Sequence, residues 1–129
     1  MTIAVPLFGL RVSPRFDCAP DMMLVTVDGG EITSRQRFSM GQINSLARIN
    51  WICQRGVDVV VCGGITRFSM RSLTNRGLQV FPWVTGDAEE IIEMFLSGRL
   101  RSGLVVEAGK RQRRWRCRGR RGNGPWVMD

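Results

Sequence analysis

Four cysteines are the side chains in this chain with the most evident capacity for chemistry: Cys18, Cys53, Cys62 and Cys117. No two of them form a C-x-x-C pair, so in a reducing compartment we expect free thiols or metal ligands and not disulfides. The chain has no histidine and no tyrosine, which removes the commonest general base and metal ligand. Metal chemistry would therefore depend on thiolates, backbone N–H groups and arginine.

Cys62 ends the apolar run VDVVVC and is followed by Gly63 and Gly64. Ligands of open α/β sheets gather beyond the carboxyl ends of the strands. The two glycines would expose N–H groups beside the start of the next helix, which forms an anion site with Cys62 as a soft ligand at its rim. The alternative is that Cys62 is a small core residue and the glycines only let the chain turn.

The loops at 10–20 and 84–87 also follow predicted strands and supply further candidates. Cys18 lies on the first loop between two prolines, where a thiol is either a ligand or a structural residue. Arg15 and Arg67 could add positive charge from the sides. Of the remaining thiols, Cys53 lies on the apolar face of a helix and is expected in the core. Cys117 lies among arginines, which would lower its pKa and make it reactive if exposed.

The elements that would position these residues follow from apolar periodicity and turn residues. Asp28-Gly29-Gly30 predicts a hairpin, and Asp87 with Glu90 fits a helix capping box. Strands are predicted over 3–8, 22–27, 31–38, 57–62 and 78–83, and helices over 42–55, 66–76 and 87–98. The order β-β-β-α-β-α-β-α predicts an α/β domain over residues 1–100, with a five-stranded mixed sheet and helices packed on it.

Charge divides the chain into two parts. Residues 1–98 contain nine arginines and nine acids, whereas residues 99–129 contain ten basic and two acidic residues, which accounts for the net charge of +8. The segment 101–129 is rich in arginine and glycine, so we expect a basic tail that is disordered in isolation.

The sequence offers no segment that would place the chain in a membrane. No apolar run approaches the length needed to span a bilayer. The N-terminus lacks a leading basic cluster and a small-residue cleavage site, so it is interpreted as a first strand, and the expected compartment is the cytoplasm.

Five stretches carry a resemblance to a known family: IAVPLFGLRVSPRFDCAP, MLVTVDGGEI, RGVDVVVCGGI, GLQVF and AEEIIEMFLSGRL. Together they resemble the dinitrogenase iron–molybdenum cofactor biosynthesis family, the small domain shared by NifX-type and NifB C-terminal proteins. The resemblance covers about residues 2–100 and is strongest where RVSPRF follows the first strand and VVVCGGI lies mid-chain.

The resemblance implies a ribonuclease H-like fold and a non-catalytic role in holding or delivering an anionic iron–sulfur or molybdenum–sulfur cluster, or its precursor, to or from a partner protein. The residues that it implicates lie in three loops: Ser13, Pro14, Arg15, Phe16, Cys62, Gly63, Gly64, Thr85 and Gly86. Many relatives have a histidine where this chain has Arg15, or in a stretch corresponding to residues 38–41. This chain cannot use histidine ligation, which weakens the case for nitrogenase in particular and leaves a more general cluster carrier.

Two other functions compete with this interpretation. The tail interleaves arginine with Trp115 and Trp126, a combination suited to single-stranded nucleic acid or to an acidic protein. A two-metal nuclease is rejected because the first strand carries no acid and the other predicted strands offer only Glu31 and Asp58, each near a strand start. Redox catalysis at Cys18 or Cys62 lacks a basic partner. We therefore expect a binding protein and not an enzyme.

Overall fold

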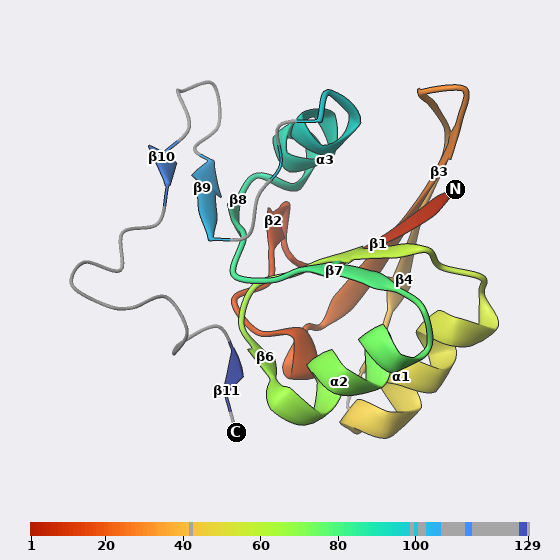
Figure 1. Cartoon of the computed structure of the whole chain (residues 1–129), viewed down its shortest axis with the longest axis vertical. Coiled ribbons are helices and arrows are strands. Elements are labelled where there is room, and N and C mark those ends of the chain that lie inside the picture. The colour runs from red at the N-terminus through yellow and green to blue at the C-terminus, as the bar shows by residue number, and fades with distance from the viewer. Residues whose placement is uncertain (42, 99, 101–102, 107–112, 115–126, 129) are drawn as a thin grey trace.

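The computed structural model describes residues 1–41, 43–98, 100, 103–106, 113–114 and 127–128. The main strands are β1 (Thr2–Phe8), β3 (Asp21–Asp28), β4 (Glu31–Ser39), β5 (Val59–Val61) and β7 (Gln79–Phe81). Shorter strands are β2 (Arg11–Val12), β6 (Ile65–Thr66) and β8 (Thr85–Gly86). The helices are α1 (Ser45–Gln54), α2 (Arg67–Asn75) and α3 (Ala88–Leu96), with a short 3-10 turn at Phe16–Cys18 (Figure 1).

The central sheet has the strand order β4-β3-β1-β5-β7, and β2 pairs with the end of β1. Strands β1, β3 and β4 are antiparallel, whereas β5 and β7 run parallel to β1 and to each other. The predicted α/β class and mixed sheet are therefore confirmed. The strands β2, β6 and β8 were not predicted, because two residues are too few for an alternating pattern to be visible.

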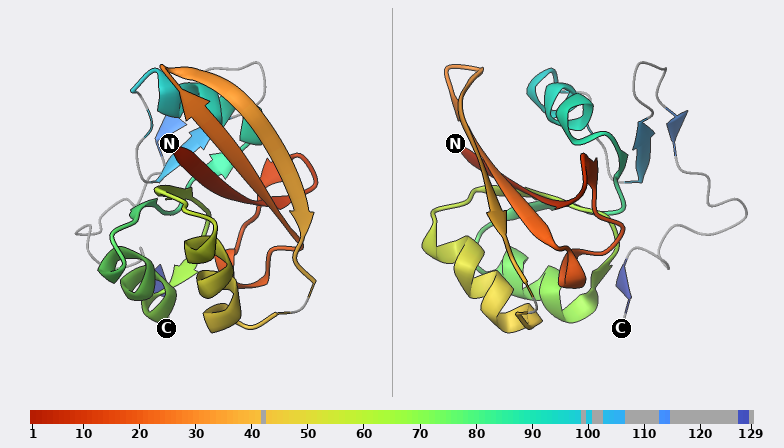
Figure 2. Two further views of the ribbon diagram at one scale, coloured as in Figure 1. Left: turned by 90° about the vertical axis from the view of Figure 1, so that its right-hand side faces the viewer. Right: turned by 180° about the vertical axis from the view of Figure 1, so that it is seen from behind.

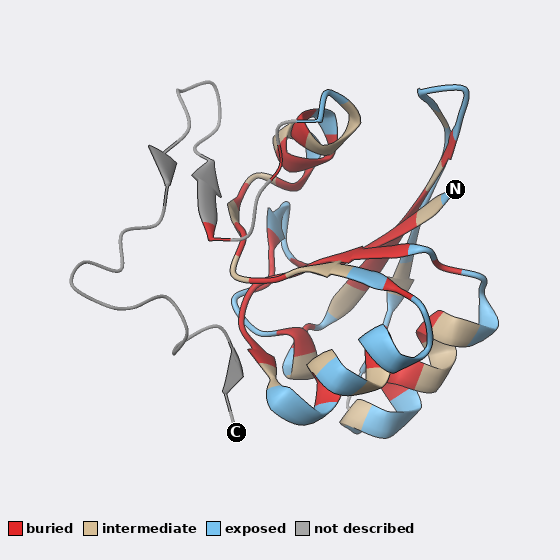
Figure 3. Ribbon diagram, in the orientation of Figure 1, coloured by how far each residue is buried: buried red, intermediate tan, exposed pale blue. Residues whose placement is uncertain are grey.

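Helices cover both faces of this sheet. Helices α1 and α2 lie side by side on one face, and α3 lies on the other (Figure 2). The three valines of β5 contribute to the core on both faces of the sheet. Val59 and Val61 pack with α3, whereas Val60 packs with α1 and α2. This explains why the strand has no polar face: it is covered on both sides (Figure 3).

Each helix begins at a side chain that accepts a hydrogen bond from the first turn. Asn44, Thr66 and Asp87 accept from the backbone N–H groups of the third residue after each of them, at 2.8, 3.2 and 3.1 Å. Such caps satisfy N–H groups that have no partner within the helix and typically contribute about 1 kcal/mol each. The caps predicted at Thr66 and Asp87 are thus present.

Both arginines of the edge strand β4 form ion pairs within the domain. A bulge opposite Thr26 and Val27 shifts the register of β4 on β3. Arg35 then pairs with Glu89 of α3 at 2.8 Å, and Arg37 pairs with Asp21 of β3 at 2.6 Å. Paired charges along an edge strand disfavour sheet extension by another chain.

Three short strands of the C-terminal segment lie beside the domain. Strand β9 (Leu104–Val106) runs parallel to β8, β10 (Arg113–Arg114) pairs with β9, and β11 (Val127–Met128) runs parallel to β6. The rest of the predicted basic tail, including Trp115, Cys117 and Trp126, lies outside the described residues. Its predicted disorder therefore stays a prediction.

Among the residues that the structure describes, no helix has both the length and the apolar character needed to cross a membrane.

Candidate functional site

Backbone hydrogen bonds join the loops beyond β1, β5 and β7. The Gly64 N–H donates to the Pro14 carbonyl at 2.7 Å, and the Phe16 N–H donates to the Gly64 carbonyl at 2.7 Å. The Trp83 N–H donates to the Gly63 carbonyl at 2.9 Å. The three segments that the sequence placed beyond strand ends therefore meet in space, with the glycine segment between the other two.

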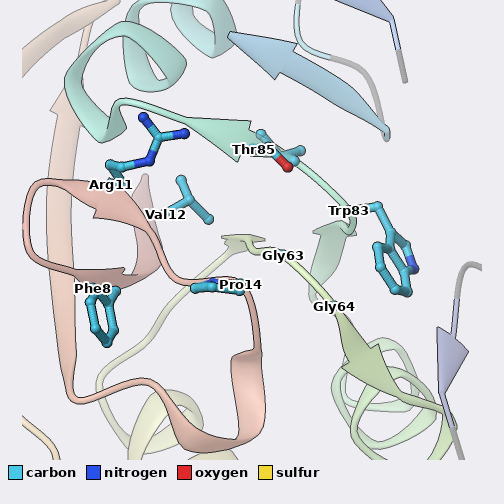
Figure 4. A pocket seen from close by; sticks show the side chains of 9 residues that line it. Phe8, Arg11, Val12, Pro14, Gly63, Gly64, Trp83 and Thr85 are labelled. Atoms are coloured by element: carbon cyan, nitrogen blue, oxygen red, sulfur yellow. The ribbon is translucent and has the colours of Figure 1, made fainter. Parts of the chain in front are cut away.

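A pocket of about 310 Å³ opens where these loops meet (Figure 4). Its walls are apolar side chains and glycine backbone, with one cation and one hydroxyl among them. The lining residues are Phe8, Arg11, Val12, Pro14, Gly63, Gly64, Trp83, Val84 and Thr85.

Another part of the chain approaches both glycines and leaves no room for a side chain at Gly63. A Cβ atom built on Gly63 would collide with the Ser13 carbonyl oxygen and lie 2.8 Å from the Pro14 carbonyl oxygen. A Cβ on Gly64 would lie 3.2 Å from the Pro14 oxygen and 3.4 Å from the indole ring of Trp83. The close approach of the 13–14 backbone therefore requires glycine at position 63 and leaves little room for a side chain at position 64.

The pocket retains polar groups that an anion could use. Arg11 is exposed at its edge and has no ion-pair partner in the part of the chain that the structure describes. Thr85 places its hydroxyl in the wall on the same side, on β8 (Figure 4). The Gly63 N–H, unlike the Gly64 N–H, has no acceptor among the described residues. The predicted anion site is therefore reduced to one glycine amide and supplemented by Arg11.

Trp83 has an unusual backbone conformation in this wall. Its φ of 60° is in the left-handed region, which costs a residue with a Cβ about 1–2 kcal/mol. Its indole Nε1 is buried and has no hydrogen-bond partner in the described structure. Strained residues concentrate at binding sites, so the backbone of Trp83 adds to the case for this pocket, whereas its indole N–H has no exposed surface and does not open into it.

Cys62 lies in the core and not at the rim of the site. Its exposed fraction is 0%, and it packs in the cluster beneath α1 and α2. Burial, with a smaller contribution from the Asp17 carboxylate, raises the pKa of the Cys62 thiol far above its ordinary value. Burial thus favours the protonated thiol, whereas a metal ligand must be a thiolate, and the enclosed sulfur cannot reach a metal ion at the rim. The prediction of Cys62 as a rim ligand is wrong.

Several other predicted residues support the site from outside its lining. Ser13 is buried and its hydroxyl donates to the Arg15 carbonyl at 3.0 Å, while Phe16 is fully buried in the core. Arg15 and Arg67 are exposed but do not line the pocket. Gly86 is buried next to Thr85, at a φ of 138° that only glycine adopts readily.

Cys18 is also outside the pocket. It is exposed at the end of the Phe16–Cys18 turn. In the described residues, no group of three or more histidine, cysteine, aspartate or glutamate side chains is arranged to hold a metal ion. A metal bound in the pocket would therefore have to bring its own ligands.

Asp17 makes the contacts that the sequence did not reveal. Its carboxylate accepts hydrogen bonds from the hydroxyls of Ser45 and Ser69, both at 2.6 Å, and from the Thr66 N–H at 3.3 Å. These partners lie at the N-termini of α1 and α2, so one carboxylate fixes both helices against the first loop.

Next to this carboxylate lies a buried arginine. Arg48 has an exposed fraction of 1%, and its Nη1 donates to the Ala19 carbonyl at 3.1 Å. Its Nε is buried without a partner in the described structure. Burial lowers the pKa of Arg48, and the Asp17 carboxylate opposes that shift. Asp17 thus supplies the nearby negative charge that a buried guanidinium needs.

Comparison with known proteins identifies the family. The model of the family described as dinitrogenase iron–molybdenum cofactor matches residues 1–98, which include all three loops of the pocket. The chain belongs to this family. The resemblance seen in the sequence is thereby confirmed, and membership suggests a role in metallocluster biosynthesis.

Relatives of this family member are distant in sequence. An uncharacterized protein of Methanocaldococcus jannaschii is 26% identical over 105 residues, which cover 78% of this chain and 89% of the relative. The crystal structure of PH0822 superposes with a TM-score of 0.74 at 22% identity, covering 79% of this chain and 94% of that one. The apo form of the orange protein from Desulfovibrio gigas gives 0.64 at 20% identity, covering 78% and 91%. These structures support the fold.

Proposed function

We propose that the pocket binds an anionic iron–sulfur or molybdenum–sulfur species as cargo and passes it between proteins of metallocluster assembly without catalysing a reaction. The observation that carries this proposal is that Arg11, the Thr85 hydroxyl and Gly63, whose N–H has no acceptor among the described residues, line a pocket whose other walls are apolar. The ribonuclease H-like description of the fold, the cytoplasmic location and the donor or acceptor protein belong to the same proposal.

The chemistry of the walls suits such a cargo. Ligand pockets usually enclose about 300–1,000 Å³, so a pocket of about 310 Å³ favours a compact molecule. Sulfide ligands are weak hydrogen-bond acceptors, and the properties of metal–sulfur clusters depend on N–H donors to sulfur and on limited solvent access. The Gly63 amide could donate to sulfide, the Trp83 ring could pack against the cargo, and Phe8 and Val12 could limit contact with water.

The charge of the pocket lining favours an anionic ligand over a free metal cation. A bare cation would find neither a thiolate nor a carboxylate among the lining residues, and it would be repelled by Arg11. A thiometalate that carries its own sulfides needs only charge compensation and hydrogen bonds. Cys18 has no part in this pocket, and a role for Cys117 stays a prediction because that residue lies outside the described ones.

Anaerobic loading tests the proposal. The protein is mixed with iron, sulfide and molybdate, desalted, and assayed by its visible spectrum and its metal content. Arg11→Gln should retain clearly less metal than the parent, whereas Cys62→Ala should retain as much. Arg35→Gln is the control, because it removes one arginine charge from β4 and Arg35 does not line the pocket. Equal metal retention by Arg11→Gln and the parent would overturn the assignment.

A further inference from the structure

The two faces of the domain differ in charge. Helices α1 and α2 contain no acidic residue, whereas α3 on the opposite face contains Glu89, Glu90 and Glu93. The balance of nine arginines and nine acids in residues 1–98 therefore conceals a separation of charge. The face formed by α1, α2 and the residues that end them, which we call the basic helical face, is the positive side.

Three arginines of this face lie near the C-terminal ends of the two helices. The Arg55 guanidinium stacks on the Trp51 ring at 4.0 Å from its centroid and lies 5.3 Å from that of Phe38. Arg76 donates from Nη1 to the Asn50 amide oxygen at 2.8 Å, which connects the end of α2 to α1. Arg71 is exposed one turn earlier on α2.

None of these three arginines has a carboxylate partner in the described structure. This contrasts with Arg35 and Arg37 of β4, which pair with Glu89 and Asp21 at 2.8 and 2.6 Å. The domain thus pairs both arginines of its edge strand with carboxylates, and it leaves Arg55, Arg71 and Arg76 of the basic helical face without an ion-pair partner among the described residues. Such a surface attracts an external anion.

Aromatic side chains accompany the positive charge. Phe68 is 54% exposed on α2, three residues before Arg71 and therefore on the same side of the helix. The stacked pair of Trp51 and Arg55 presents a second planar group on α1. Planar side chains interleaved with guanidinium groups provide the stacking and charge used by proteins that bind single-stranded nucleic acid.

We infer that the basic helical face binds single-stranded nucleic acid, independently of the cargo pocket. An acidic protein would match the positive charge of this face but not the arrangement of its exposed apolar side chains. Protein interfaces place apolar groups at the centre and charges at the rim, whereas here the two exposed apolar side chains lie on separate helices, and Phe68 lies between Arg67 and Arg71 in α2.

Fluorescence anisotropy with a labelled oligouridylate of about 15 nucleotides tests this inference in the full-length chain, because single-strand sites span about 4–16 nucleotides. The test variant is Arg55→Gln/Arg71→Gln. The control is Arg35→Gln/Arg37→Gln, which removes the same net charge from β4. Because both retain the basic C-terminal segment, its contribution is the same in each.

In Arg55→Gln/Arg71→Gln, the loss of two phosphate contacts should lower the slope of log affinity against log salt by about 1.4. It should also lower the affinity at 0.1 M salt by about 25-fold. The control should change affinity by less than about threefold. Phe68→Ala should weaken binding by about fivefold or more, with the salt slope unchanged, because stacking involves no counterion release.

Equal effects of the two double variants would overturn the inference. Binding of polyglutamate as tight as that of the oligonucleotide would also overturn it, because the face would then recognise negative charge alone. Thermal unfolding of each variant verifies that the substitutions leave the domain folded.

Discussion

Replacing Gly63 by alanine tests whether the chain itself, and not a ligand, fixes the residue types after β5. In ordinary conformations a glycine-to-alanine change stabilises a protein by about 0.4–1 kcal/mol through the unfolded state. At Gly63 the new Cβ would meet the carbonyl oxygens of Ser13 and Pro14, both of which belong to the backbone and cannot rotate away. The loop must therefore move.

The free-energy cost of this movement depends on the packing and hydrogen bonds that it disturbs. Overpacking in a tight interior costs about 1–3 kcal/mol. Displacing the Pro14 carbonyl also weakens the hydrogen bonds that join it to Gly64 and join Gly64 to Phe16, both 2.7 Å long, at about 0.5–1.5 kcal/mol each. After the gain from the unfolded state is subtracted, Gly63→Ala should lower the free energy of unfolding by about 2–4 kcal/mol.

Urea unfolding measures this difference, with Gly64→Ala as the matched control. At Gly64 the nearest contacts are 3.2 Å to the Pro14 oxygen and 3.4 Å to the Trp83 ring, which can move slightly. That variant should lose about 1 kcal/mol or less. A midpoint for Gly63→Ala equal to or above that of the parent, with an unchanged slope, would refute the argument.

Three further predictions concern the charged and thiol groups near the first loop. Asp17→Asn should lower the free energy of unfolding, measured by urea unfolding, by about 2–4 kcal/mol. The substitution weakens three hydrogen bonds and leaves Arg48 without its nearby counter-charge. A loss below about 0.5 kcal/mol would contradict this. Above the ordinary thiol pKa of 9.0, the unfolded chain releases the Cys62 proton that the native protein keeps, so stability should fall by up to about 1.4 kcal/mol per pH unit. This decline should be shallower in Cys62→Ala, and an identical pH slope in the two proteins would exclude Cys62 as its source. In the native protein, Cys18 should react with a thiol reagent while Cys62 does not, and mass spectrometry of the labelled peptides distinguishes the two; rapid labelling of Cys62 would contradict its burial.

The elements of the domain are largely visible in the sequence because local patterns specify them. Alternation, the Asp28-Gly29-Gly30 turn and the caps at Thr66 and Asp87 each depend on residues within a few positions of one another. The VVV strand is covered on both faces, as its continuous apolar character predicted. The meeting of the three loops was also predictable, since parallel strands end at one edge of a sheet.

The details of the site depend on contacts between distant parts of the chain. A glycine pair beyond a strand has the same sequence signature whether a ligand or a neighbouring loop approaches it, and only the Ser13 and Pro14 carbonyls distinguish the two cases. Cys62 was misplaced for the same reason, because exposure at a strand end depends on what packs above it. Arg11 was missed although it belongs to the first candidate loop, since nothing local separates it from Arg15.

The shared attachment of α1 and α2 to Asp17 has a consequence for how the domain opens locally. Because one carboxylate holds the N-termini of both helices, neither can fray there without releasing a bond that also positions the other. Amide hydrogen exchange in the first turns of the two helices should therefore proceed through a common opening event with similar protection, and the turn at Phe16–Cys18 should open with them.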